Sequence, residues 1–211
     1  MKLIGMLDSP YVRRVAISLQ LLGLHFEHQS LSVFRAFPEF QKINPVVKAP
    51  TLICDDGNVL MESTLIIEYA QAIVRPRTLM PAELPELQRT LRAVGLALAA
   101  CEKAVQIIYE RGLRPPEKMH EPWIERVTGQ LLAAFGALEV ELARHHLAVE
   151  RATINQAGVS VAVAWEFTQQ MLPELVPAAS YPRLLAFSNR AETLPEFRAA
   201  PHGDSTYQQR G

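Results

Sequence analysis

Ser9-Pro10-Tyr11-Val12 is the stretch that decides how the chain begins to fold. It lies between a short apolar run, Lys2 to Leu7, which predicts a strand, and an apolar-periodic segment reaching Leu22, which predicts a helix. Pro10 has the fixed φ and the missing N–H that suit the first position of a helix, so we expect Ser9 to be the N-cap. A hydroxyl at such a turn lies beside the positive end of a helix dipole, where an anion such as a thiolate is held well. A helix cap with no other role also fits a Ser-Pro pair.

The following residues extend this start into a small mixed sheet. His25 to Ser32 predicts a second strand, parallel to the first if the crossover is right-handed. After a link over 34–43, two β-rich runs flank the turn 55–58 and predict a hairpin, and Glu62-Ser63 then opens another helix. The order β-α-β, link, β-β-α is the thioredoxin-like arrangement, a four-stranded mixed sheet with helices on both faces.

A proline-punctuated linker, Arg75 to Pro85, ends this α/β part, and every later signal is helical. Apolar stripes over 86–110 and 117–146 predict two long antiparallel helices, because their connection is short. Thr153-Ile154-Asn155-Gln156 fits a capping box, and the helix after it is apolar or small all round, which predicts burial. We therefore expect an α/β thioredoxin-like domain over 1–78 and an all-α domain over 86–211.

Composition narrows the classes of partner. The 211 residues include 22 acidic and 21 basic ones, so bulk charge favours neither nucleic acid nor an anionic membrane. We expect a small-molecule ligand or a protein partner instead. The N-terminus lacks a signal-peptide pattern and no apolar run approaches the roughly 20 residues of a membrane helix, which predicts a cytoplasmic protein. Cys54 and Cys101 are too few for a disulfide framework and too isolated for zinc, so we expect small core residues and no metal.

Two domains of this kind, in this order, resemble a cytosolic glutathione transferase. The resemblance rests on Ser9-Pro10-Tyr11-Val12-Arg13, on Asn44-Pro45 shortly before Ala49-Pro50-Thr51-Leu52, on Glu62-Ser63 and on the Thr153 box. It runs nearly the full length of the chain. It implies the glutathione transferase fold, a homodimer, and glutathione as cosubstrate with no metal or organic cofactor.

Ser9 stands where glutaredoxin-like members of the superfold carry the first cysteine of Cys-Pro-Tyr-Cys. A serine cannot form the mixed disulfide of dithiol exchange. It can donate a hydrogen bond to the thiolate of bound glutathione and lower a thiol pKa that starts near about 8.5. The resemblance therefore implies Ser9 as the catalytic residue. For Arg13 and Arg14 beside it, we expect salt bridges to the helical domain.

The resemblance also implies which residues bind glutathione. Pro50 should be cis, and the backbone of Ala49 should pair with the cysteinyl residue of the tripeptide as a short added strand. Ser63 would offer its hydroxyl and N–H to the γ-glutamyl carboxylate while Glu62 fixes the turn. Lys48 would reach the glycyl carboxylate, although a solvated surface lysine fits as well. Taken alone, Glu62-Ser63 is also simply a helix N-terminus.

The electrophile pocket, by the same resemblance, lies between Ser9 and the helical domain. Its candidate lining residues are Gln106, Tyr109 and Trp123, with Tyr207 near the C-terminus. This lining sets the choice of substrate, and the sequence does not identify that substrate.

The expected function is glutathione transfer to an electrophilic small molecule. One alternative is a non-catalytic protein of the same fold that acts through protein–protein binding, as stringent-starvation regulators do with RNA polymerase. Another is a glutathione-dependent isomerase or disulfide reductase sharing the same site, with the serine weighing against the reductase.

Overall fold

The computed structural model describes residues 1–207, and its internal contacts divide the chain into two compact units. The first unit joins residues 1–80 to the segment from Glu192 onward, and the second spans Pro81–Ala191. This differs from the expected boundaries, which gave all of 86–211 to the helical domain. The cause is the short helix α8, Pro195–Ala199, which packs against α1, Pro10–Leu21, in the first unit.

The first unit is built on a four-stranded mixed sheet in the order β2-β1-β3-β4. The strands are β1 (Lys2–Ile4), β2 (Glu27–Gln29), β3 (Thr51–Ile53) and β4 (Val59–Met61). β1 runs parallel to β2 and antiparallel to β3, and β3 and β4 form the antiparallel hairpin. The predicted thioredoxin-like arrangement is confirmed, with strands shorter than the apolar runs that predicted them.

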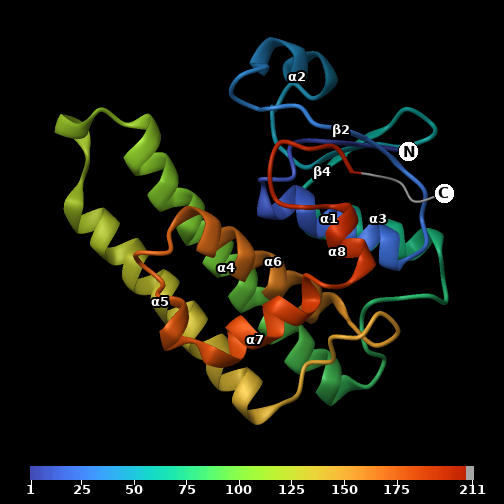
Figure 1. Cartoon of the computed structure of the whole chain (residues 1–211). Coiled ribbons are helices and arrows are strands. Elements are labelled where there is room, and N and C mark those ends of the chain that lie inside the picture. The colour runs from blue at the N-terminus through green and yellow to red at the C-terminus, as the bar shows by residue number, and fades with distance from the viewer. Residues whose placement is uncertain (208–211) are drawn as a thin grey trace. The chain divides into compact units, whose positions relative to one another are not determined.

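Helices cover both faces of this sheet, as Figure 1 shows: α2 (Phe37–Ile43) lies on one side, and α1 and α3 (Ser63–Ile73) on the other. Side chains alternate along a strand, so neighbouring residues of β1 serve different faces. Ile4 packs with Leu31 and with Phe40 of α2. The sheet is therefore closed on both sides, and its loops carry the predicted glutathione-binding residues.

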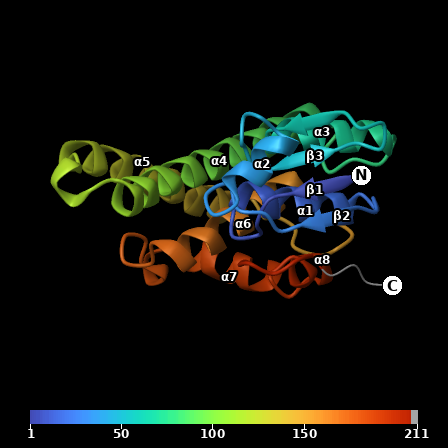
Figure 2. The same ribbon diagram turned by 90° about the horizontal axis from the view of Figure 1, so that it is seen from above.

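The second unit is entirely helical within the described residues. It contains α4 (Leu84–Leu113), α5 (Glu121–Arg144), α6 (Gln156–Met171) and α7 (Pro182–Ala191), with 3-10 turns at 116–118 and 178–180. Figure 2 shows α4 and α5 lying side by side as the predicted antiparallel pair. Within residues 1–207, no helix combines the length and the apolar character that crossing a bilayer requires.

The predicted buried helix is α6, and twelve of its sixteen residues are buried. Trp165 stands at its centre, edge-on to Phe135 at 5.5 Å and to Tyr181 at 5.8 Å between ring centroids. A Cβ added at Gly158 would lie only 2.8 Å from Cγ1 of Ile154, so the close approach at the start of α6 requires glycine. Small residues thus let α6 occupy the middle of the unit.

The predicted capping box at the start of α6 is wrong in register. Asn155 is the N-cap: its side chain accepts from the Gly158 N–H at 3.1 Å. Thr153 lies before the helix, in a turn in which its N–H and hydroxyl both donate to the Glu150 carbonyl. Asparagine is as good a cap as threonine or better, and it stands directly before the first helical residue.

Candidate functional site

Ser9 occupies the turn between β1 and α1 and caps the helix, as predicted. Its backbone is extended, and its Oγ accepts a long hydrogen bond of 3.4 Å from the Val12 N–H. The side chain is half-buried, and no acceptor for its hydroxyl hydrogen occurs among residues 1–207. Because the cap uses the oxygen only as an acceptor, the O–H can donate outward from the positive end of α1.

Gly5 brings the start of this turn close to α1 and to the loop before β3. It has φ +134°, and a Cβ placed on it would meet Val12 Cγ2 at 2.6 Å and the Ala49 Cβ at 3.1 Å. A larger residue here would displace the helix or the loop. The contact places Ala49 next to the strand end that leads to Ser9.

The Ala49-Pro50 peptide bond is cis, as the resemblance implied. Two side chains brace this turn: Asn44 Nδ2 donates to Thr51 Oγ1 at 2.9 Å, and that hydroxyl donates to the Lys48 carbonyl at 2.7 Å. Among the described residues, neither the N–H nor the C=O of Ala49 has a hydrogen-bond partner. The loop thus presents one free backbone donor and one free acceptor, which an extended peptide can use.

Glu62 and Ser63 form the N-terminus of α3, as predicted. Glu62 has φ +76°, and its carboxylate caps the helix by accepting from the N–H groups of Thr64 at 3.1 Å and Leu65 at 3.3 Å. The Ser63 side chain is buried, and its hydroxyl donates to Glu62 Oε1 at 3.3 Å. The single hydroxyl hydrogen of Ser63 is therefore in use within the protein.

Arg14 holds the Ser63 side chain through a hydrogen bond, a role that the sequence did not predict. Its side chain is buried, and Nη1 donates to Ser63 Oγ at 2.9 Å and to Thr64 Oγ1 at 3.2 Å. Both of these bonds lie within the first unit, and the expected salt bridge from Arg14 to the helical domain stays a prediction. A guanidinium behind the N-terminus of α3 adds positive charge where a carboxylate would sit. Arg14 lies off the apolar stripe of α1, so the sequence pattern gave no signal that it is buried.

Arg13 makes the predicted ion pair with a residue of the stretch 86–211, Glu192, which the contacts of the chain assign to the first unit. Nη1 and Nη2 donate to the two carboxylate oxygens of Glu192 at 2.7 and 2.6 Å, and Nε donates to the Ala200 carbonyl at 2.8 Å. Its guanidinium also lies 5.7 Å from the ring centre of Phe197. Arg13 thus anchors the C-terminal segment on α1 and is not directed toward an anion at Ser9.

Asp8 gives the Ser9 turn an acidic neighbour. Burial raises the pKa of its carboxyl above the usual range; nearby His202 opposes this shift and Asp204 adds to it. Both of those residues belong to the C-terminal segment. The chemistry next to Ser9 therefore depends on residues nearly 200 positions away in the sequence.

The remaining predicted residues belong to the loop before β3 and to the helices of the second unit. Lys48 is exposed in the loop before β3. Gln106 and Tyr109 lie on α4 and Trp123 on α5, in the second unit; Tyr109 and Trp123 are 43% and 42% exposed. Gln106 donates to Glu102 at 2.8 Å, and its Oε1 is buried without a partner among the described residues. Their role in an electrophile pocket stays a prediction.

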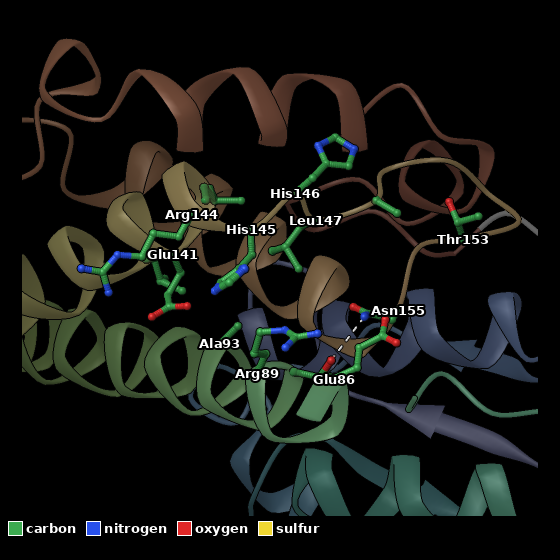
Figure 3. A pocket seen from close by; sticks show the side chains of 14 residues that line it. Glu86, Arg89, Ala93, Glu141, Arg144, His145, His146, Leu147, Thr153 and Asn155 are labelled. Carbon is green, nitrogen blue, oxygen red and sulfur yellow. Dashed lines mark hydrogen bonds between the residues drawn. The ribbon is translucent and has the colours of Figure 1, made fainter. Parts of the chain in front are cut away.

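A pocket of about 340 Å³ lies within the second unit and contains none of the predicted site residues. Figure 3 shows Glu86 and Arg89 near Asn155 on one side, with Glu141 and His145 beside them. Acidic and basic groups alternate around it, and Arg92 already neutralises Glu141 at 2.8 Å. Among residues 1–207, no three His, Cys, Asp or Glu side chains are grouped so as to hold a metal.

Comparison with known proteins shows what the chain is similar to. The sequence model of the "Glutathione S-transferase, N-terminal domain" matches residues 3–78. The chain is 26% identical over 164 residues to the "Uncharacterized GST-like protein YibF" of Escherichia coli K12, covering 78% of this chain and 80% of that one. It is 28% identical to a solved glutathione transferase family member of Pseudomonas fluorescens Pf-5 with bound S-(propanoic acid)-glutathione, with a TM-score of 0.76 over 95% and 98% of the two chains.

A second solved structure matches the whole fold. It is a glutathione S-transferase from Methylobacterium radiotolerans in complex with glutathione sulfonate, 24% identical, with a TM-score of 0.87 over 100% of this chain and 98% of that one. At this identity the likeness establishes the fold alone. The matched N-terminal domain, the relatives that span most of the chain and the shared two-unit fold agree: residues 3–78 form a glutathione S-transferase N-terminal domain, and the chain as a whole is similar to bacterial glutathione transferases.

Proposed function

We propose that the first unit binds glutathione and that Ser9 holds its sulfur as a thiolate for attack on an electrophilic small molecule. The observation that carries this proposal is the Ser9 hydroxyl, whose hydrogen has no acceptor within residues 1–207 while its oxygen caps α1. The relative from Pseudomonas fluorescens, solved with a glutathione conjugate, supports the choice of ligand.

Three backbone and side-chain features would hold the tripeptide. The free N–H and C=O of Ala49 would pair with the cysteinyl residue as an added strand. The γ-glutamyl carboxylate would bind at the N-terminus of α3, using the Ser63 N–H and the positive charge of Arg14 behind it. Lys48, exposed in the adjoining loop, would attract the glycyl carboxylate.

The chemistry follows from the charge on sulfur. An O–H donor favours the thiolate over the thiol, and each unit of pKa lowering corresponds to about 1.4 kcal/mol of preference. The thiolate then attacks the electrophile, and the enzyme supplies proximity and a fixed hydrogen bond. Gln106, Tyr109 and Trp123 would contact the electrophile, with the unpartnered Oε1 of Gln106 as an acceptor for a polar substrate group.

Titration of bound glutathione tests the role of Ser9. Ser9→Ala should leave glutathione affinity nearly unchanged and raise the pKa of the bound thiol, read from thiolate absorbance against pH. Ser32→Ala is the matched control, because Ser32 caps a turn through the N–H groups of Phe34 and Arg35 without facing a helix end. An identical titration in Ser9→Ala and wild type would remove Ser9 from this role.

Calorimetry tests the pocket itself. Reduced glutathione should bind one site per chain, and Ser63→Ala should weaken that binding by about 1–3 kcal/mol, because the buried Arg14 guanidinium loses the hydroxyl that holds it behind the N-terminus of α3. No binding at millimolar glutathione would favour the non-catalytic, protein-binding alternative.

Parallel assays with aryl halides, maleyl-type cis-alkenes and mixed disulfides would separate transferase, isomerase and reductase activities.

We also propose a homodimer through one apolar face of the first unit. Five large apolar side chains on β4 and α3 are more than a third exposed: Val59, Met61, Leu65, Tyr69 and Ile73. Val59 and Met61 share one face of β4, and Leu65, Tyr69 and Ile73 share one face of α3, so these exposed apolar faces indicate an interface, and a second copy of the chain is the occupant expected for glutathione transferases. Sedimentation should give a dimer for wild type and a monomer for Leu65→Glu; a monomeric wild type at micromolar concentration would refute the proposal.

A further inference from the structure

The C-terminal segment 200–207 lies along β2, the edge strand of the sheet. The Tyr207 N–H donates to Nδ1 of His28 at 2.9 Å, and the Tyr207 ring stacks on Phe26 with centroids 4.5 Å apart and planes 12° apart. Ser30 Oγ donates to the Asp204 carbonyl at 3.0 Å. The segment therefore contacts the edge strand and its neighbours through the side chains of Phe26, His28 and Ser30.

His28 makes hydrogen bonds with both ring nitrogens, and the two bonds fix its protonation state. Nε2 lies 2.7 Å from the Gly5 carbonyl oxygen, which can only accept, so Nε2 carries the hydrogen. Nδ1 faces the Tyr207 N–H, which can only donate, so Nδ1 carries none. Only the neutral Nε2–H tautomer satisfies both bonds. A protonated ring would place a hydrogen against the Tyr207 N–H.

The Gly5 bond connects this arrangement to the Ser9 turn. Gly5 follows β1 directly and packs against Val12 of α1, the residue whose N–H Ser9 caps. His28 thus joins the C-terminal segment to the backbone that leads into the turn. The segment in turn brings Asp204 and His202 into the electrostatic surroundings of Asp8.

We infer that His28 is a positioning residue: its neutral imidazole joins the C-terminal segment to the strand end before Ser9 through its hydrogen bonds to Tyr207 and Gly5. We call this pair of hydrogen bonds the His28 clip. Protonation of the ring breaks the bond to Tyr207 and so opens the clip. The inference does not rest on glutathione binding, because every contact lies within the ligand-free first unit. It adds a proton-dependent control of the Ser9 turn to the proposed function.

The direction of the pH dependence follows from linkage. Burial lowers the pKa of His28, although the bond to Gly5 opposes this shift. The open clip exposes the ring, which then takes up a proton near its ordinary pKa of about 6.5. The free energy that favours the closed clip is therefore fully present above that pH. It decreases as the pH falls toward the lowered pKa of His28 in the closed form. One proton changes the open-to-closed ratio by at most about tenfold per pH unit.

The other charged groups around His28 do not produce this effect. Lys2 on β1 and Glu27 on β2 line the same shallow hollow, as does the Tyr207 phenol, whose pKa burial raises further above neutral pH. Asp204 pairs with Arg35 at 3.0 Å, but both side chains are about 70% exposed, so the pair is weak. The stacked rings of Phe26 and Tyr207 do not titrate in this range and keep the opened segment nearby.

NMR on the ligand-free full chain between pH 5 and 8 tests the clip. The ring nitrogen shifts of His28 should report the Nε2–H tautomer at pH 8. The protection factor of the Tyr207 amide, corrected for intrinsic exchange, should fall as the pH drops below about 6.5, by up to tenfold per unit. Constant protection while His28 becomes protonated, or an Nδ1–H tautomer at pH 8, would overturn the inference.

Two variants isolate the histidine. His28→Gln keeps one donor and one acceptor at similar positions but does not titrate, so Tyr207 protection should become independent of pH. His25→Gln removes an exposed histidine from the preceding loop and should behave as wild type. Asp8 and His202 are unchanged in both, so persistent pH dependence in His28→Gln would assign the effect to them and refute the clip. If His28→Gln does not fold, NMR titrations of the wild type and of His25→Gln still show whether protection of the Tyr207 amide follows the protonation of His28.

Discussion

Helix α1 buries two arginines, whereas α6 buries no charged side chain. Arg13 and Arg14 are each 2% exposed, and their partners come from distant parts of the first unit: Glu192 and Ala200 for one, Ser63 and Thr64 for the other. In α6 the buried polar groups Ser160 and Thr168 return their hydroxyls to carbonyls one turn earlier in the same helix. The bonds of these two arginines in α1 are long-range, and those of Ser160 and Thr168 in α6 are local.

The two helix N-termini differ in the same sense. Asn155 is well bonded at α6, since its Oδ1 caps Gly158 at 3.1 Å and its Nδ2 reaches Thr90 Oγ1. Ser9 caps α1 through a longer bond of 3.4 Å and keeps its hydrogen for an outside acceptor. A helix used only for packing satisfies its own end. Helix α1, which would present the Ser9 hydroxyl to glutathione under the proposed function, leaves its end less fully bonded and is held in place by buried side chains farther along.

Removing the centre of α6 should have the largest effect in this comparison. Trp165→Ala should reduce the free energy of unfolding by about 3–5 kcal/mol, because the cavity left between Phe135 and Tyr181 cannot close fully. Urea unfolding followed by circular dichroism measures the loss. Trp123→Ala, which removes a 42% exposed ring from α5, serves as the control and should cost far less. Equal losses would mean that α6 is not the core of its unit.

Removing the Arg13 anchor should rank next. Arg13→Ala should cost about 3 kcal/mol, the low end for a broken buried pair, since Glu192 keeps 27% exposure and can rehydrate. Limited proteolysis should show earlier cleavage after residue 192, while the second unit resists as before. Arg13→Lys keeps the charge without the two-pronged geometry and should fall between alanine and wild type. A C-terminal segment as protected in Arg13→Ala as in wild type would contradict the anchor.

Removing the cap of α6 should have a smaller effect. Asn155→Ala should cost about 1 kcal/mol, the usual value for losing a side-chain cap. Thr153→Ala is the matched variant: it removes the residue of the predicted capping box, which lies outside the helix. Its effect on the midpoint of urea unfolding should be within error. A larger loss of stability in Thr153→Ala than in Asn155→Ala would indicate that Thr153 is the N-cap of α6, as the capping box predicted.

Removing the cap of α1 should have the smallest effect on stability. Ser9→Ala should change the free energy of unfolding by about 0.5 kcal/mol, at the bottom of the range for caps, because its bond to Val12 is long. The difference between Asn155→Ala and Ser9→Ala, measured in the same urea series, tests the contrast directly. A cost at Ser9 equal to that at Asn155 would indicate that its oxygen is fully committed to the helix.

Local patterns predicted most of the fold. Pro10 after a hydroxyl residue, the turn 55–58 and the alternating apolar runs each point to one local structure, and the strand order follows from them with right-handed crossover. The register of the α6 cap was wrong because Thr153 and Asn155 are both good caps, and only packing selects between them. The end of the helical domain was misplaced because periodicity shows that 195–199 is helical but not what it packs against.

The sequence by itself determined the elements, their order, the cap at Ser9 and the likeness to glutathione transferases, since these depend on residues close together in the chain or on motifs with fixed spacing. Only the tertiary structure decided that Arg14 supports Ser63, that Arg13 holds Glu192, and that His28 bonds Gly5 and Tyr207 together. Each of these bonds spans between 23 and 179 positions. Such pairings depend on how the elements pack in three dimensions, and no periodicity in the chain encodes that packing.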